Sequence, residues 1–314
     1  MAAAAGTPGF WTRPIAGSAY PVALAPEGED PGQSFTRLLG GVMVVMTLLG
    51  FVIVVPLVTT AVTWLGYQVD RPGTDWAAYQ VTAQGFGTVW GVLAAHLGLS
   101  AMLLVVWAFF HFLHHRPLAW LWSVTPGVRW GYAGLCTAVA VVVIGAVAAY
   151  NWVVGPGWHP PVGWGWYVVV IVATTPFQAL AEEVMFRGYL LQAFGSLWRN
   201  PWFPIVATAV VFALFHGTQN LWLFSSRLMF GLLAGVLVWR TGGLEAGVAI
   251  HVVNNLFAFG VALFSGTLPQ VRTATAVGAG QALSDVGMFA LSALACWGIA
   301  VALKLRRTVQ AVAE

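Results

Sequence analysis

The stretch Gln178–Arg187 reads QALAEEVMFR and places two adjacent glutamates and an arginine inside an apolar part of the chain. The whole chain of 314 residues contains only ten acidic residues. An ionised side chain at the depth of a bilayer costs about 2.5–3.5 kcal/mol on insertion scales. Because such carboxylates need partners, we interpret Glu182 and Glu183 as part of a functional site.

The composition predicts a membrane protein. Hydrophobic residues make up 59% of the chain and charged residues 7%, whereas a soluble domain carries about 25% charged residues. The mean hydropathy is +0.82. The net charge of +3 is small and dispersed, which argues against a nucleic-acid partner. Cys136 and Cys296 each lie in an apolar run and are predicted to be buried rather than joined in a disulfide.

The apolar runs predict an all-α polytopic bundle in a lipid bilayer, because a helix needs about 20 apolar residues to cross the hydrocarbon core. Eight segments are expected to cross: Leu38–Leu65, Thr88–Leu113, Gly131–Val154, Trp166–Leu191, Trp202–His216, Leu221–Trp239, Leu244–Phe264 and Val286–Leu303. The fifth is short, and a continuation past Gly217 would place His216 deeper in the membrane. The bundle is expected over residues 37–305, between a disordered N-terminal tail at 1–36 and a C-terminal tail at 306–314.

The basic residues predict the orientation of the bundle. Ten of them fall on one side: Arg13, Arg37, Arg116, Arg129, Arg187, Arg199, Arg240, Lys304, Arg306 and Arg307. The other side holds Arg71 and Arg272, and Arg227 lies within a segment. This bias predicts a multi-pass protein of the cell membrane with both termini in the cytoplasm.

Helical spacing groups the polar residues of three segments. Glu183 and Arg187 are four residues apart and can pair, which would partly offset the cost of burying Glu183. Adjacent helical residues point about 100° apart, so Glu182 is then free to face a polar cavity. His251 and Asn255 share one helix face, and His216 follows the fifth segment. We therefore expect Glu182, His216, His251 and Asn255 to converge.

This set of side chains suits hydrolysis. A carboxylate in a partly dry site can act as a general base on water, and an imidazole can share that water. A second imidazole and an amide N–H can stabilise an oxyanion. Glu182, His216 and His251 would equally suit a zinc ion with one open position. The residues alone do not separate these alternatives.

The ordered motifs Glu-Glu-x-x-x-Arg, Phe-x-x-x-His and His-x-x-x-Asn resemble the CPBP family of intramembrane proteases, which includes the CAAX prenyl proteases and the bacteriocin-processing, Abi-type proteases. The resemblance spans about residues 165–260 and matches at Glu182, Glu183, Arg187, Phe212, His216, His251 and Asn255. It implies an endopeptidase that cleaves a membrane-associated peptide or protein. It further implies that Glu182 and His216 activate water and that His251 and Asn255 support the oxyanion.

We favour the metal-free form of this chemistry, with zinc as the alternative, because Glu183 is expected to pair with Arg187 and Asn255 suits an oxyanion better than a metal. Two rival functions remain open. A proton-coupled transporter would relay protons through Glu182 and Glu183, and a catalytically silent immunity or scaffold protein would only bind a partner. The substrate, any role of prenylation, the oligomeric state, and the roles of His96 and Arg227 are not indicated by the sequence.

Overall fold

The computed structural model describes residues 14–24, 34–155, 157–198 and 200–310. Most of these residues are helical with no strand among them, and their two isolated bridges join Ala19 to Thr308 and Ser123 to Gly243. The predicted all-α bundle is therefore confirmed. Cys136 and Cys296 are both buried and free, as expected.

Seven helical segments are long and apolar enough to cross a membrane in the described part of the chain. Five are single helices: α1 (Ser34–Asp70), α6 (Trp130–Val154), α10 (Leu221–Thr241), α11 (Glu245–Phe264) and α13 (Ala279–Ala302). Two are composite. One joins α3 (Val89–Ser100), α4 (Met102–Ala108) and the π-helical η2 (Phe109–Leu113); the other joins α7 (Trp164–Glu183), the π-helical η3 (Val184–Leu190) and α8 (Leu191–Leu197). Short helices α2 (Trp76–Gln84), α5 (Ala119–Trp122) and α12 (Leu268–Thr273) connect them.

The expected fifth crossing is a shorter helix, α9 (Trp202–Leu214), of 13 residues. Its length is about 20 Å, against the roughly 30 Å of a hydrocarbon core. The predicted extension of this helix past Gly217 is wrong, because α9 ends at Leu214. Gly217 has a φ of +78°, which is outside the right-handed helical region. His216 therefore lies in the turn beyond α9.

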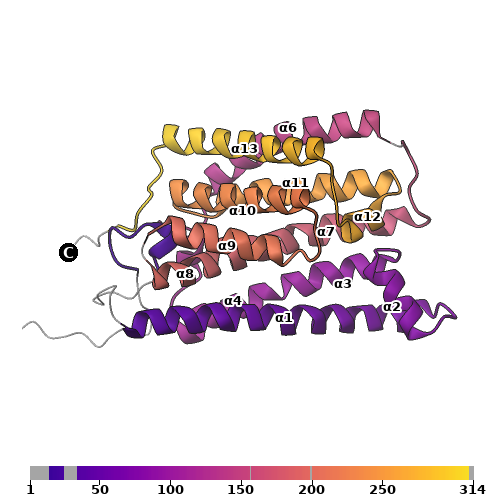
Figure 1. Cartoon of the computed structure of the whole chain (residues 1–314), viewed down its shortest axis with the longest axis horizontal. Coiled ribbons are helices and arrows are strands. Elements are labelled where there is room, and N and C mark those ends of the chain that lie inside the picture. Colours follow the sequence, from indigo (N-terminus) through magenta and orange to yellow (C-terminus); the bar gives the residue numbers. More distant parts are fainter. Residues whose placement is uncertain (1–13, 25–33, 156, 199, 311–314) are drawn as a thin grey trace, which may run out of the picture.

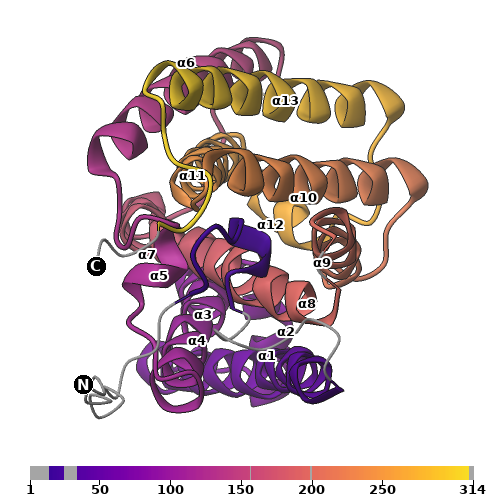
Figure 2. The same ribbon diagram turned by 90° about the vertical axis from the view of Figure 1, so that its left-hand side faces the viewer.

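The helices form two rows (Figures 1 and 2). In one row α11 lies between α6 and α7, and α3 lies between α7 and α1; in the other, α10 lies between α13 and α9, and α8 follows α9. Contacts of α13 with α6 and of α1 with α8 join the rows. The start of α1 and the end of α13 lie at the same end of the bundle (Figure 1), here named the terminal end.

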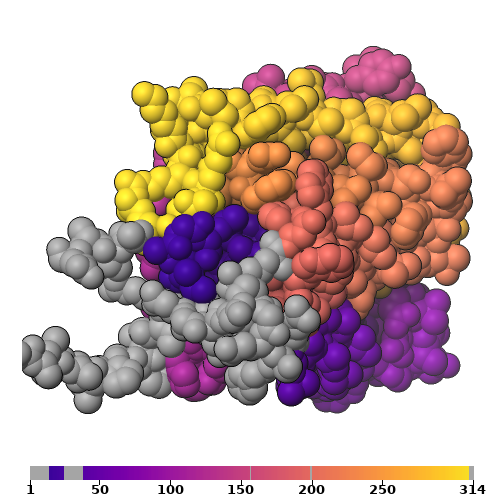
Figure 3. All heavy atoms as spheres, turned by 60° about the vertical axis from the view of Figure 1, so that its left-hand side comes forward, coloured from indigo at the N-terminus to yellow at the C-terminus, as the bar shows by residue number. Residues whose placement is uncertain are grey.

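Residues 14–24 close the terminal end. Tyr20, in the short η1 (Tyr20–Val22), is fully buried, and its hydroxyl donates to the Leu121 carbonyl. Arg116 donates to the Ala23 carbonyl at 2.6 Å. Figure 3 shows this segment in indigo against the yellow C-terminal residues. These residues are thus packed, contrary to the tail expected at 1–36, while residues 1–13 and 25–33 of that tail lie outside the described residues.

The close approach of α9 and α10 depends on small residues. A Cβ atom on Gly231 would lie 2.9 Å from the Cα of Ala209, and one on Gly235 would lie 3.0 Å from the Ile205 side chain. Without a driving force between apolar surfaces in lipid, such close backbone packing is a main source of helix association. This contact fixes α9, and therefore His216, against α10.

Candidate functional site

The C-terminal end of α7 carries the paired glutamates, which face different neighbours. Glu183 is fully buried, and its Oε1 accepts from Arg187 Nη1 at 3.0 Å and from His251 Nδ1 at 2.8 Å. Its Oε2 lies beside Gly247, where a Cβ atom would approach to 3.0 Å. The predicted Glu183–Arg187 pair is confirmed, and His251 joins it.

Arg187 is 1% exposed and is surrounded by aromatic rings. Its guanidinium carbon lies 4.1 Å from the ring centre of Phe212 and 5.1 Å from that of Phe230. Cation–π contacts with desolvated rings add to the ion pair. The orientation predicted from the sequence placed Arg187 among the ten basic residues on one side of the membrane. Because Arg187 is buried inside the bundle, it does not belong to that group.

Glu182 faces the interior of the bundle, and each of its carboxylate oxygens has a neighbouring side chain. Gln178 Nε2 donates to its Oε1 at 2.6 Å, and His251 Nε2 lies 3.5 Å from its Oε2. The side chain is 12% exposed. His251 therefore stands between the two glutamates, with Nδ1 held by Glu183 and Nε2 beside Glu182. A distance of 3.5 Å is too long for a strong hydrogen bond.

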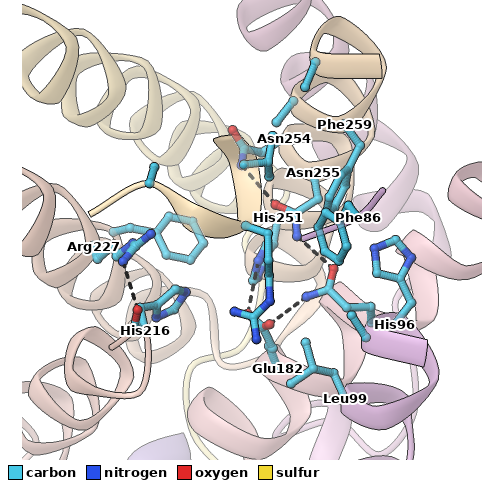
Figure 4. A pocket seen from close by; sticks show the side chains of 18 of the residues that line it. Phe86, His96, Leu99, Glu182, His216, Arg227, His251, Asn254, Asn255 and Phe259 are labelled. Carbon is cyan, nitrogen blue, oxygen red and sulfur yellow. Dashed lines mark hydrogen bonds and ion pairs between the residues drawn. The ribbon is translucent and has the colours of Figure 1, made fainter. Parts of the chain in front are cut away.

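Three side-chain amides form a chain of hydrogen bonds, here named the amide relay, in which each amide donates to the next and the last donates to Glu182 (Figure 4). Asn254 Nδ2 donates to Asn255 Oδ1 at 3.1 Å, and Asn255 Nδ2 donates to Gln178 Oε1 at 3.0 Å. Because a carboxylate accepts only, the Gln178 amide must turn its nitrogen to Glu182 and its oxygen to Asn255. Asn255 keeps a second amide hydrogen that Gln178 does not use.

His216 stands on the other side of the site, in the turn after α9. Its Nδ1 donates to the Phe212 carbonyl at 2.7 Å, so the neutral ring presents a lone pair at Nε2. Arg227 of α10 donates from Nη1 to the His216 carbonyl at 3.4 Å. Figure 4 shows His216 and Arg227 together, across from Glu182 and His251.

A cavity of about 1060 Å³ lies between the two helix rows and contains this site. Glu182, His216, His251 and Asn255 all line it, so the predicted convergence is observed. Many of its other lining residues lie toward the end opposite the terminal end, including Thr63 of α1, Asn151 of α6 and Arg272 of α12. Toward the terminal end, Tyr20, Tyr189 and Leu190 are fully buried in the core.

His96 also has a partner that the sequence did not indicate. Its Nδ1 lies 2.7 Å from Thr174 Oγ1, and its ring packs edge-on against Phe259 at 4.9 Å. His96 is 1% exposed and borders the cavity wall. It joins α3 to α7 and α11 at a distance from the glutamates.

The arrangement of the donors does not suit a metal ion. Among the described residues no group of three or more His, Cys, Asp or Glu side chains is placed to hold one. Both ring nitrogens of His251 are directed at glutamates, and Glu183 is already shared with Arg187.

Gln178 and Asn254 are the site residues without a role in the sequence-based interpretation. The only signal for Gln178 is its spacing of four residues from Glu182 on one helix face. Asn254 adjoins Asn255 in the chain, and the two side chains are hydrogen-bonded. The amide relay could not be read from spacing, because it depends on how α7 and α11 are rotated.

Replacing Gln178 by Leu is expected to slow the hydrolysis that the sequence predicts about tenfold, since hydrogen bonds to charged groups contribute about 1.5–3 kcal/mol. Leucine has a similar size but cannot orient Glu182 or Asn255. The measurement is the turnover rate of purified protein on a membrane-anchored peptide. Gln192→Leu, on α8 and away from the cavity lining, is the matched substitution. Equal rates for wild type and Gln178→Leu would remove Gln178 from the site.

A comparison with known protein families matches the part of the chain that contains the site residues. Residues 164–257 match the family described as type II CAAX prenyl endopeptidase Rce1-like. The uncharacterized protein YyaK of Bacillus subtilis (strain 168) is 26% identical over 163 residues, which cover 48% of this chain and 54% of that protein. The chain thus spans about half the length of this relative. No solved structure matches. The match over residues 164–257, which include all seven motif positions, confirms the resemblance of this part of the chain to the CAAX prenyl protease family.

Proposed function

We propose that the protein is an intramembrane endopeptidase that hydrolyses a peptide bond of a membrane-associated substrate with water activated by Glu182 and His216. The observation that carries the proposal is the position of Glu182. One of its oxygens is fixed by Gln178, the other lies beside His251, and the side chain borders a large cavity inside an apolar bundle. The family match of residues 164–257 supports the same reaction class.

The chemistry follows from the hydrogen-bond directions. A water between Glu182 and His216 gives one proton to the carboxylate, while His216 Nε2 accepts a hydrogen bond from the other. The water oxygen then bonds to the scissile carbonyl carbon. As the carbon–nitrogen bond breaks, the proton held by Glu182 passes to the leaving amine, so the carboxylate is regenerated.

The oxyanion formed in this step is assigned to Asn255 and His251. Asn255 offers its unused amide hydrogen. For His251 to donate from Nε2 as well, its ring must carry N–H groups at both nitrogens, because Nδ1 already donates to Glu183. Glu183 and Arg187 hold His251 through Nδ1 and act as positioning residues.

The shape of the cavity favours a single reaction site over a transport path. A proton-coupled transporter needs polar groups that lead to both ends of the bundle. Here the cavity extends away from the terminal end, and the packed core around Tyr20 and Tyr189 lies between the glutamates and that end. A catalytically silent protein would share this cavity, and an activity assay separates it from the enzyme.

The proposal is tested with purified protein in phospholipid vesicles and a set of membrane-anchored peptides, whose fragments are identified by mass spectrometry. We expect one defined cut, and we expect cleavage to survive exhaustive chelation, with metal content measured alongside. Activity that is lost on chelation and returns with zinc would overturn the metal-free mechanism. Absence of any cut would favour the silent protein.

We also propose that the terminal end faces the cytoplasm of the cell membrane. The protein is a multi-pass membrane protein with both described ends of the chain at one end of the bundle. Of the basic residues, Arg116, Arg129, Arg240, Lys304, Arg306 and Arg307 are at or near that end by their helix positions, and Arg71 and Arg272 are at the other. Arg13 and Arg199 lie outside the described residues.

A membrane-impermeant maleimide tests this orientation, because the natural cysteines are buried. Ala77→Cys on α2 is expected to react in intact cells, whereas Gln310→Cys is expected to react only after lysis. Both positions are exposed. The reverse pattern would contradict the orientation.

A further inference from the structure

Arg227 is a cation on the wall of the cavity whose role the proposed reaction does not explain. It lies six residues after the start of α10, beside Ser226, which also lines the cavity. An arginine within an apolar helix is costly and marks a functional group by default. The inference below rests on the proposed function, because it concerns a substrate in the same cavity.

Arg227 has no ion pair among the described residues, and the carboxylate whose charge acts on it, Glu182, is itself held by Gln178. The hydrogen bond of Arg227 to the His216 carbonyl, at 3.4 Å, is longer than the usual range of about 2.7–3.2 Å. The ion pairs of the described residues involve Arg129, Arg187 and His251 but not Arg227. A guanidinium has five donors, so most of its hydrogen-bonding capacity remains for another group.

The acidic residues nearest to this wall have other partners. Glu183 is bound by Arg187 and His251, and Glu182 accepts from Gln178. Asp285 of α13 lines the same cavity but accepts from Gln281 at 2.7 Å. Arg187 and Arg129 each combine an ion pair with an aromatic ring, as Arg129 does with Glu245 and Tyr132. Arg227 has neither among the described residues.

We propose that Arg227 binds a carboxylate of the substrate chain and so sets the position of the scissile bond. A planar guanidinium matches a carboxylate with two parallel hydrogen bonds, which gives orientation as well as affinity. Arg227 contacts His216, so the carboxylate lies next to the reacting water, on the side of the cavity opposite Glu182 (Figure 4). The carboxylate belongs either to the C-terminus of the chain or to an acidic side chain near the cleaved bond.

Binding is measured separately from cleavage in the Glu182→Gln protein, held in vesicles of zwitterionic lipid. Three fluorescent membrane-anchored peptides of one sequence are compared: the free C-terminal acid, the C-terminal amide, and the amide with one acidic side chain near the end. We expect one carboxylate form to bind about tenfold more tightly than the plain amide, as a charge-assisted pair would provide. Arg227→Gln is expected to reduce that ratio to about one, and Arg227→Lys to restore part of it.

Arg272→Gln is the matched control, because Arg272 is the other arginine on the cavity wall and lies in α12, away from His216. It is expected to keep the ratio. If Arg227→Gln only disturbs the turn that holds His216, it will weaken the binding of all three peptides alike. The ratio of carboxylate to amide affinity would then stay unchanged, and that result would overturn the proposal. The proposal would also be overturned if the Glu182→Gln protein with Arg227 intact bound all three peptides equally. A carboxylate preference that appears only with anionic lipid would overturn it as well. A carboxylate preference without cleavage by wild type would retain this site and reject the protease.

Discussion

Replacing Glu182 by Gln is expected to lower the cleavage rate by about 10²–10⁴-fold, the usual contribution of a general base. The substitution keeps the size of the side chain and leaves an amide oxygen that can still accept from Gln178. It removes the group that takes the proton from water. The buried Glu183–Arg187–His251 cluster is untouched, so the amount of folded protein should stay near that of wild type.

Asp285→Asn is the matched control for this experiment. It makes the same change from carboxylate to amide within the same cavity, at a residue whose partner is Gln281. We expect it to retain most of the wild-type rate. Equal losses for the two variants would mean that the cavity needs negative charge in general, and a fully active Glu182→Gln protein would remove Glu182 from the reaction.

Replacing Arg187 by Ala is expected to destabilise the fold by about 3–5 kcal/mol, because it leaves the Glu183 carboxylate buried without its cation. It also removes the contacts with the rings of Phe212 and Phe230. The measurement is the folded yield in detergent and the midpoint of unfolding. Arg240→Ala, which loses only a contact with the Trp239 ring near the end of α10, should have a much smaller effect.

Removal of both charges provides a further check on the pair. In Glu183→Gln with Arg187→Leu no uncompensated buried charge remains, so we expect much of the folded yield to return. His251 would lose the carboxylate that holds its Nδ1, so activity should stay low. A folded yield as poor as that of Arg187→Ala would show that Arg187 acts through its ring contacts rather than through Glu183.

Residue spacing was sufficient for the parts of the site that lie on one helix. The pair of Glu183 with Arg187 and the shared face of His251 and Asn255 both follow from a repeat of about four residues. The lengths of the apolar runs likewise indicated the long helices. These features depend on one segment at a time, and local sequence determines them.

Features that depend on packing between segments were not visible in the sequence. The contact of His251 with both glutamates and the relay from Asn254 to Gln178 require the rotation of α11 against α7. The change from α- to π-helix after Glu183 has no distinctive residue, and α7 continues through Pro176 without a break. Tyr20 lies in a segment rich in Ala, Gly and Pro, and only its deep burial against α5 shows that it belongs to the core.

The most direct test of the account is cleavage of a membrane-anchored peptide by the purified protein in water enriched in oxygen-18. The account predicts one cut and one heavy oxygen in the new carboxylate, formed by wild type and lost in the Glu182→Gln protein. Peptides that stay intact with folded wild-type protein would contradict the account, as would a cut that the Glu182→Gln protein makes at the wild-type rate.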